Sequence, residues 1–231
     1  MNSLTKKLSE LYKNYKHLLW LTYFLIYMPW FTYLEQTVTS RYHVIHTFLD
    51  DFIPFCEYFI IPYYLWFAYV AWAVIYTALR NVEDYYKLCK VLFTGMTVFL
   101  IISTIYPNGH NLRPDYFSRH NICTYLVEKL YASDTSTNLF PSIHVYNSLA
   151  VEFFVLNSKD LKNNRIVKFL SGILCISIIL ATMFLKQHST FDVITAFLLA
   201  SFMYYLVYMR PEKALEKNTT KPSQACKVGS V

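Results

Sequence analysis

Apolar residues run in six long blocks along the chain, and short polar or charged segments separate them. Most of the blocks approach the 20 or so residues that an α-helix needs to cross the hydrocarbon core of a bilayer. The pattern therefore predicts an all-α, polytopic membrane protein built as a bundle of six transmembrane helices. The predicted spans are Leu18–Tyr33, Phe55–Leu79, Leu88–Tyr106, Phe140–Leu156, Ile166–Leu185 and His188–Met209.

The composition agrees with a single transmembrane domain over residues 1–210. Hydrophobic residues make up 55% of the chain and charged residues 16%, against about 25% charged residues in soluble domains. The formal charge of +6 is spread over loops between the apolar blocks and forms no single basic patch, which argues against a nucleic-acid partner. Residues 211–231 are polar and predict a disordered C-terminal tail.

Lysine and arginine residues are distributed unequally between alternate loops. Sixteen of the 21 lie in the N-terminal segment, the second loop, the fourth loop or the C-terminal tail, and five lie on the opposite side. Because cytoplasmic loops carry the excess of positive charge, both termini are predicted to be cytoplasmic. The long loop 107–139 then lies on the extracytoplasmic or lumenal side of the cell membrane, or of an internal membrane if the source is eukaryotic.

Three groups of polar residues gather at span ends on this outer side. Arg113 follows the third span, Ser142 and His144 begin the fourth, and His188 and Asp192 begin the sixth. Six alternating spans bring these segments to one membrane face without further assumption. The fourth span is also the least hydrophobic, because it carries His144, Asn147, Ser148 and Glu152. Polar groups at membrane depth usually face the bundle interior or a water-filled cavity, so this span is predicted to form a wall of the site.

The chemistry of these residues suits an anionic substrate. The fourth and sixth helices begin at the same face, so their free main-chain N–H groups and positive dipole ends are expected to point into one pocket. Arg113 can donate paired hydrogen bonds to phosphate oxygens, and Ser142 can cap its helix. His188 and Asp192 are four residues apart on one helix face, so the carboxylate can orient the imidazole. His144 supplies a second imidazole, able to protonate a leaving oxygen.

Pro-Ser-Ile-His at residues 141–144, followed by His-x-x-x-Asp at residues 188–192, resembles the type-2 phosphatidic acid phosphatase superfamily. That family has three motifs, Lys-x6-Arg-Pro, Pro-Ser-Gly-His and Ser-Arg-x5-His-x3-Asp, and their order on a six-span bundle matches about residues 100–205. The resemblance implies that His188 attacks phosphorus and forms a phosphohistidine, that Asp192 orients it and that His144 is the acid. It also implies that Arg113 and Ser142 bind phosphate, and it implies no metal and no other cofactor.

The sequence departs from these motifs at four positions. The lysine of the first motif is Tyr106, the glycine of the second is Ile143, and the Ser-Arg pair of the third falls on Ala181-Thr182. Two of the family's usual phosphate-binding cations are therefore missing. Lys186 is a candidate replacement for a lost cation, and Tyr106 is a candidate site residue or an anchor at headgroup level.

The leading hypothesis is an integral-membrane enzyme that hydrolyses a lipid phosphate or pyrophosphate, from a phospholipid or a prenyl phosphate, at the extracytoplasmic face. One alternative is transfer of a phospho-headgroup between lipids. Pro-Ser-Ile-His is also similar to the motif of inositol phosphorylceramide synthases, which, like sphingomyelin synthases, use the same His/His/Asp set. A phosphodiester carries less charge than a phosphomonoester and needs fewer cations. The second alternative is a non-catalytic membrane protein, a transporter, a scaffold or a degenerate family member, which the two lost cations favour.

Overall fold

The computed structural model describes residues 12–13 and 15–211, so almost all of the predicted tail lies outside the described residues. Eleven helical elements and two short strands follow one another in this part of the chain. They are η1 (Lys16–Tyr23), α2 (Phe24–Thr37), β1 (His43–Val44), η2 (Phe48–Asp51), η3 (Glu57–Phe59), α3 (Ile60–Arg80), α4 (Val82–Ile105), β2 (Asn108–Gly109), α5 (Ile122–Ser133), α6 (Ile143–Asn157), α7 (Arg165–Phe184), α8 (Thr190–Tyr204) and η4 (Tyr205–Met209).

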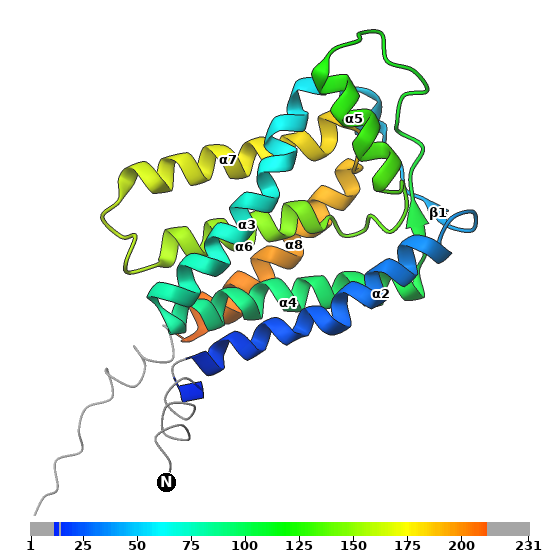
Figure 1. Cartoon of the computed structure of the whole chain (residues 1–231). Coiled ribbons are helices and arrows are strands. Elements are labelled where there is room, and N and C mark those ends of the chain that lie inside the picture. The colour runs from blue at the N-terminus through cyan, green and yellow to red at the C-terminus, as the bar shows by residue number, and fades with distance from the viewer. Residues whose placement is uncertain (1–11, 14, 212–231) are drawn as a thin grey trace, which may run out of the picture.

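The helices form a bundle in which α6 is the central element (Figure 1). It packs against α3, α4, α7 and α8, and buried apolar side chains from all five helices form one continuous core. The first element, η1, and the last, η4, lie at the same end of the bundle, at the lower left of Figure 1. The opposite end carries the loops that follow α2, α4 and α7, together with α5.

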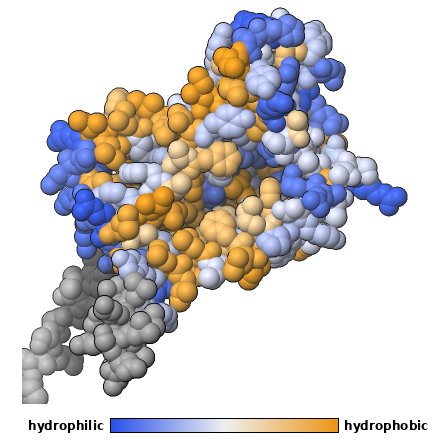
Figure 2. Space-filling model, viewed as in Figure 1, coloured by the Kyte–Doolittle hydropathy of each residue, from blue (hydrophilic) through white to orange (hydrophobic). Residues whose placement is uncertain are grey.

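The predicted all-α membrane class is confirmed. Within residues 12–13 and 15–211, four helical segments are long and apolar enough to cross a bilayer: Glu57–Arg80, Val82–Ile105, Arg165–Phe184 and Thr190–Met209. The chain is an integral membrane protein. The helices α2 and α6 are shorter, with 14 and 15 residues, so the full count of six spans stays a prediction. In Figure 2, hydrophobic side chains cover the middle of the visible face and hydrophilic ones gather toward its two ends.

Several predicted helix boundaries were wrong by a few residues. The predicted third span begins six residues late, because Asn81 caps α4 by accepting hydrogen bonds from the main chain of Glu83 and Asp84. The predicted fourth and sixth spans begin too early, because α6 starts at Ile143 and α8 at Thr190. The helix α5 in the outer loop was missed altogether, since its 12 residues are too few and too polar to stand out as a span.

A glycine allows α4 and α6 to approach closely. The Tyr146 ring lies over Gly95, where an added Cβ would come within 2.0 Å of the ring. The Tyr146 hydroxyl donates a 2.8 Å hydrogen bond to the Val91 carbonyl on the same face of α4. Deeper in the bundle, Glu152, one of the polar residues of the predicted fourth span, accepts hydrogen bonds from Tyr69 on α3 and Ser171 on α7. These contacts fix α6 against three neighbours and so fix the position of its first turn.

Candidate active site

The turn between α7 and α8 determines where His188 lies. Lys186 adopts the left-handed conformation with φ of 51°, which ends α7 and reverses the chain. The main-chain N–H groups of Gln187 and His188 both donate to the Thr182 carbonyl. Ser189 then caps α8, and Asp192 returns the bond by accepting from the Ser189 N–H at 3.0 Å. His188 is therefore held by a turn and a capping box.

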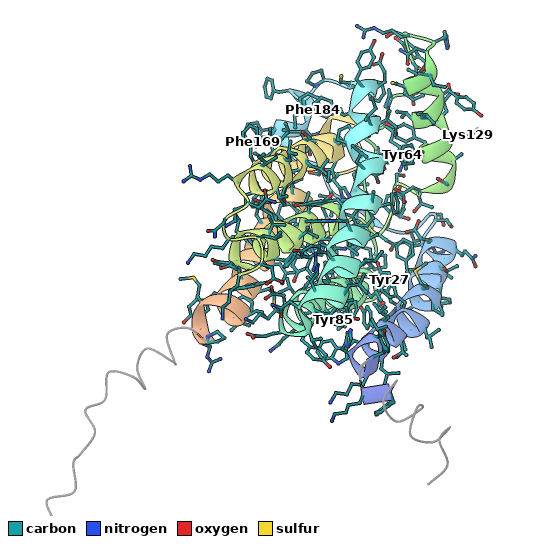
Figure 3. The ribbon with its side chains drawn as sticks, turned by 60° about the vertical axis from the view of Figure 1, so that its left-hand side comes forward. Tyr27, Tyr64, Tyr85, Lys129, Phe169 and Phe184 are labelled. Carbon is teal, nitrogen blue, oxygen red and sulfur yellow. The ribbon has the colours of Figure 1, made fainter. Side chains whose placement is uncertain are left out.

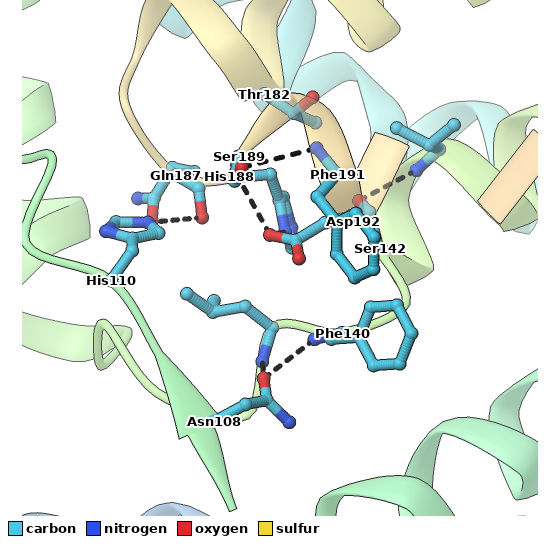
Figure 4. Close-up of polar contacts among 12 residues, drawn as sticks. Asn108, His110, Phe140, Ser142, Thr182, Gln187, His188, Ser189, Phe191 and Asp192 are labelled. Carbon is cyan, nitrogen blue, oxygen red and sulfur yellow. Dashed lines mark hydrogen bonds and ion pairs between the residues drawn. The ribbon is translucent and has the colours of Figure 1, made fainter. Parts of the chain in front are cut away.

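The structure brings His188 and Asp192 together, but the predicted reason was wrong. His188 precedes the helix, so the two residues do not share a helix face. The capping box folds the Asp192 carboxylate back toward the turn, where its Oδ2 lies 3.4 Å from His188 Nδ1. Both side chains are buried, and the other Asp192 oxygen has no hydrogen-bond partner within the described residues. Figure 4 shows the carboxylate next to the His188 ring, with the hydrogen bond from the Ser189 N–H as a dashed line.

His144 comes from the first turn of α6 and faces His188. The ring centroids of the two histidines are 5.8 Å apart, with the ring planes at 57°. The His144 ring packs against Tyr63 and Trp66 of α3, at centroid distances of 4.6 and 4.4 Å. These two aromatic rings hold the His144 imidazole in place. One imidazole from the first turn of α6 and one from the α7–α8 turn thus flank one small volume.

The first turns of α6 and α8 meet behind the histidines. The Ser142 N–H donates to the Asp192 carbonyl at 3.3 Å, and the rings of Phe140 and Phe191 stack at 5.3 Å. The segment before Ser142 is held by the Asn108 side chain, which accepts from the main-chain N–H groups of Leu139 and Phe140 (Figure 4). Ser142 caps α6 as predicted, since its hydroxyl accepts from the Val145 N–H. Its side chain is fully buried, so the structure does not present it to a ligand.

The expectation of free N–H groups at both helix starts was wrong for α8. The carboxylate of Asp50, from η2, accepts hydrogen bonds from the Thr190 N–H at 2.7 Å, the Ser189 hydroxyl at 2.6 Å and the Thr190 hydroxyl. A carboxylate at a helix N-terminus is stabilised by the unpaired donors and by the helix dipole. Burial alone would raise the pKa of Asp50, but the hydrogen bonds from Ser189, Thr190 and Thr47 outweigh it and lower the pKa to about 2. The protein's own anion thus occupies this helix start.

Arg113 lies close to the histidines, but it does not face them with a free guanidinium. Its terminal nitrogens donate to the carbonyls of Tyr131, Asp134 and Thr135 and to Gln187 Oε1, the last at 2.7 Å. Only its Nε–H has no partner within the described residues. The predicted paired donation to a phosphate is therefore not available in this arrangement, because main-chain carbonyls already hold both terminal nitrogens. Arg113 instead joins α5 to the turn that carries His188.

Sequence reasoning missed two residues of this site, Gln187 and His110. Gln187 is buried, and its amide nitrogen is a second donor without a partner in the described chain. His110 Nδ1 accepts from the Leu112 N–H, and Nε2 lies 2.9 Å from the Gln187 carbonyl, so the neutral ring carries its proton on Nε2. Burial lowers the pKa of His110 to about 4, which keeps it neutral. A single histidine in a polar loop carried no sequence signal for this bracing role.

A cavity of about 700 Å³ ends at the two histidines. Side chains of α2, α3 and α4 form its walls, and many of them are aromatic. Its outer edges are exposed side chains of α2 and α3, among them Met28, Phe67 and Ile75, so it opens sideways between these helices. In Figure 2 the same face is hollowed between hydrophobic side chains, and Figure 3 labels Tyr27 and Tyr64 on its two sides. His144 and His188 line the inner end, whereas Arg113, Ser142 and Asp192 do not line it.

The family model of the PAP2 superfamily matches residues 110–215. The match supports membership of the chain in the PAP2 superfamily, the type-2 phosphatidic acid phosphatases. Members of the PAP2 superfamily are phosphatases or phosphotransferases, so membership implies phosphatase or phosphotransferase activity at a membrane in general terms. Neither a curated protein nor a solved structure shows significant similarity to the chain. The match includes both histidines and Asp192, whereas α2, α3 and Asp50 lie outside it.

The PAP2 motif positions that lack cations have structural roles in this chain. Thr182, at the position of the motif arginine, is buried and accepts two main-chain hydrogen bonds of the α7–α8 turn. Tyr106, at the position of the motif lysine, is 44% exposed and stacks on His43 at 4.3 Å, away from the cavity. Lys186 donates from Nζ to the Asp50 carbonyl at 2.8 Å, so its ammonium holds η2. The structure therefore brings neither Tyr106 nor Lys186 to the histidines.

Proposed function

We propose that the protein is a membrane enzyme that cleaves a phosphate ester of a lipid through a phosphohistidine on His188. The observation that carries the proposal is the meeting of His144 and His188, 5.8 Å apart, at the inner end of a cavity that opens between α2 and α3. The apolar walls suit an acyl or prenyl chain, because burying hydrocarbon is favourable by about 0.8 kcal/mol per CH₂. The histidines lie where the headgroup of such a chain would stop.

The chemistry follows from the two rings and the carboxylate. Asp192 next to His188 Nδ1 favours the tautomer that carries its proton on Nδ1, which leaves the Nε2 lone pair for attack on phosphorus. As the N–P bond forms, the P–O bond to the leaving alcohol breaks, and His144 in its protonated form gives its proton to that oxygen. Water or a lipid hydroxyl then attacks the phosphohistidine, its proton passes to His144, and Nε2 is released.

The surroundings of His188 support a neutral nucleophile. Burial, with the positive charge of Arg113 as the next cause, lowers the pKa of His188 well below its usual value. The same charge favours an anionic phosphoryl group beside the ring. We propose that Arg113 acts on the phosphate chiefly through this charge and through its unpartnered Nε–H, together with the free amide of Gln187. Ser142 contributes by fixing the first turn of α6.

We infer that this end of the bundle faces the extracytoplasmic or lumenal side, because Lys and Arg are in excess in the loops of the opposite side. The termini then lie in the cytoplasm. In the described part of the chain, the proposed extracytoplasmic end of the bundle carries α5 and its neighbouring loops. The proposed cytoplasmic end of the bundle carries the start of α4 and the loop between α6 and α7.

Transfer of a phospho-headgroup is the second candidate function. The observation that favours it is the absence of the two motif cations, because Tyr106 and Thr182 bring no charge to the histidines. A phosphodiester bears one negative charge and needs less neutralisation than the two of a monoester. The transfer reaction uses the same histidines and differs only in the acceptor, which is a lipid hydroxyl in place of water.

The test is an assay of the purified full chain in lipid nanodiscs against a panel of lipid phosphates and phosphodiesters, with and without an acceptor alcohol. We expect phosphate release or headgroup exchange that vanadate inhibits, and a loss of at least about a thousandfold in His188→Ala. His120→Ala is the matched control, because His120 is an exposed histidine of the outer loop and keeps full activity. No product from any lipid, and no vanadate binding, would favour a non-catalytic protein.

A further inference from the structure

The inner end of the cavity presents hydrogen-bond acceptors beside the histidines. Glu35 from α2 and Asp134 from the end of α5 both line it, together with Asn138 and Asn147. No lysine, arginine or histidine side chain forms an ion pair with either carboxylate within the described residues. A site for a bare phosphate would instead place cations next to the histidines.

Two of these acceptors are buried without a partner. Asn138 is 4% exposed and Asn147 is 3% exposed, and the side-chain oxygen of each receives no hydrogen bond within the described residues. The orientation of the Asn138 amide is fixed, because its nitrogen donates to Glu35 Oε1 at 3.0 Å. A buried polar atom without a partner destabilises the protein, so a ligand that satisfies both oxygens regains that free energy. Both residues line the cavity, so the missing partner comes from its occupant.

The carboxylates are held in place with lone pairs to spare. Glu35 Oε2 accepts from the hydroxyl and the N–H of Thr135, at 2.6 and 3.4 Å. Asp134 Oδ2 accepts from the Tyr63 hydroxyl at 3.3 Å. A carboxylate offers about four acceptor sites, so each group retains capacity for a ligand donor. Burial, and then the charge of Glu35, raises the pKa of Asp134 to about 6.

We propose that this end of the cavity binds a hydrogen-bond-donating group, a hydroxyl or a primary ammonium, carried by the lipid substrate beyond its phosphate. The inference rests on the proposed function and specifies its substrate class: a phosphodiester lipid with a donor-rich headgroup. Asn147 lies one turn after His144 on the same face of α6, so the headgroup lies next to the histidine that protonates the leaving oxygen of the lipid alcohol. Phosphatidate lacks such a group and leaves the two amide oxygens unsatisfied.

The test measures binding in the His188→Ala background, so that no turnover disturbs the equilibrium. The full chain in nanodiscs is titrated with four lipids of matched acyl chains, and bound lipid is counted by native mass spectrometry. Phosphatidylethanolamine supplies an ammonium with N–H donors, phosphatidylinositol supplies hydroxyls, phosphatidylcholine supplies a cation without an N–H, and phosphatidate supplies none of these. We expect at least one of the first two to bind about tenfold more tightly than the last two. Comparing the affinities of phosphatidylethanolamine and phosphatidylinositol shows whether the site prefers an ammonium or a hydroxyl donor.

Asn147→Leu and Glu35→Gln are the diagnostic variants. Asn147→Leu removes an acceptor that has no protein partner and keeps the side-chain volume, so the fold is retained while headgroup selectivity falls below about threefold. Asn157→Leu is the matched control, because Asn157 is the exposed last residue of the same helix, and it keeps the selectivity. Equal binding of all four lipids, tighter binding of phosphatidate, or selectivity that survives both diagnostic variants would overturn the inference. Selective binding by a wild-type protein without any turnover would support it and overturn the proposed function alone.

Discussion

The replacement Asp50→Asn tests how the chain holds the turn that carries His188. The Asp50 carboxylate accepts hydrogen bonds from four donors. Two of them, the main-chain N–H groups of Thr47 and Thr190, can only donate and cannot act as acceptors. The hydroxyls of Ser189 and Thr190 can rotate to accept instead. Asparagine offers only one acceptor oxygen, so one main-chain N–H faces an NH₂ group and loses its partner.

The cost follows from this count. An unsatisfied buried donor costs about 1–3 kcal/mol, and loss of the negative charge at the α8 N-terminus costs about 0.3–1 kcal/mol more. We therefore expect Asp50→Asn to destabilise the protein by about 1–4 kcal/mol, which lowers the melting temperature by about 2–16 °C for a chain of this size. We also expect kcat to fall at least about tenfold with little change in KM, because the turn positions His188 without touching substrate.

Thermal unfolding in nanodiscs and kinetics well below the melting temperature measure the two effects. Asp51→Asn is the matched control, because Asp51 is exposed and its side chain hydrogen-bonds to His46 alone among residues 12–13 and 15–211, so its loss changes stability by less than about 1 kcal/mol. Asp50 is ionised in the folded state above pH of about 2 and in the unfolded chain above about 4. The wild-type advantage is therefore complete above pH 4 and disappears as the pH falls toward 2. Equal stability and equal kcat in the two variants at pH 7 would refute the reasoning.

Three further predictions concern neighbouring parts of the structure. Gln187→Glu replaces the unpartnered amide donor with a second acceptor next to Arg113, so we expect vanadate to inhibit about tenfold more weakly, measured as an inhibition constant; unchanged inhibition would exclude Gln187 from the phosphate site. Gly95→Ala forces a Cβ into the Tyr146 ring and is expected to cost about 1–3 kcal/mol in thermal unfolding, whereas Gly172→Ala, whose nearest neighbour is 3.7 Å away, is tolerated; equal melting temperatures would contradict this. His110 is neutral in the folded state down to a pKa of about 4, against 6.5 in the unfolded chain, so its contribution is complete above pH 6.5 and decreases as the pH falls toward 4. Melting temperatures at pH 7.5 and 5 are therefore expected to differ less in His110→Gln than in the wild type, and the same difference in both proteins would count against this role.

The sequence predicted the parts of the fold that depend on periodicity and spacing. Apolar blocks of span length predicted the helical membrane bundle, and their alternation brought His144 and His188 to one end of it. The motif His-x-x-x-Asp predicted the proximity of His188 and Asp192, although a capping box and not a helix face produces it. Such local patterns suffice because a helix start is determined by a few adjacent residues.

The parts that were missed depend on contacts between residues far apart in the sequence. Asp50 lies about 140 residues before Thr190, and nothing in its neighbourhood indicates that it binds the start of α8. Arg113 was expected to face the phosphate, but its terminal nitrogens are occupied by carbonyls that only the folding of α5 brings within reach. The cavity and its acceptors combine α2, α3 and α5 with α6, so no single segment could have revealed them.

The central claim is that His188 becomes covalently phosphorylated, and direct detection of the intermediate tests it. The wild-type protein is mixed with a lipid substrate labelled at phosphorus, quenched under alkaline conditions within milliseconds, digested and mapped by mass spectrometry. We expect the label on the imidazole of His188, a faster loss of that label when an acceptor alcohol or water is available, and no label in His188→Ala. Turnover that persists in His188→Ala, or a label that maps to another residue, would contradict the mechanism.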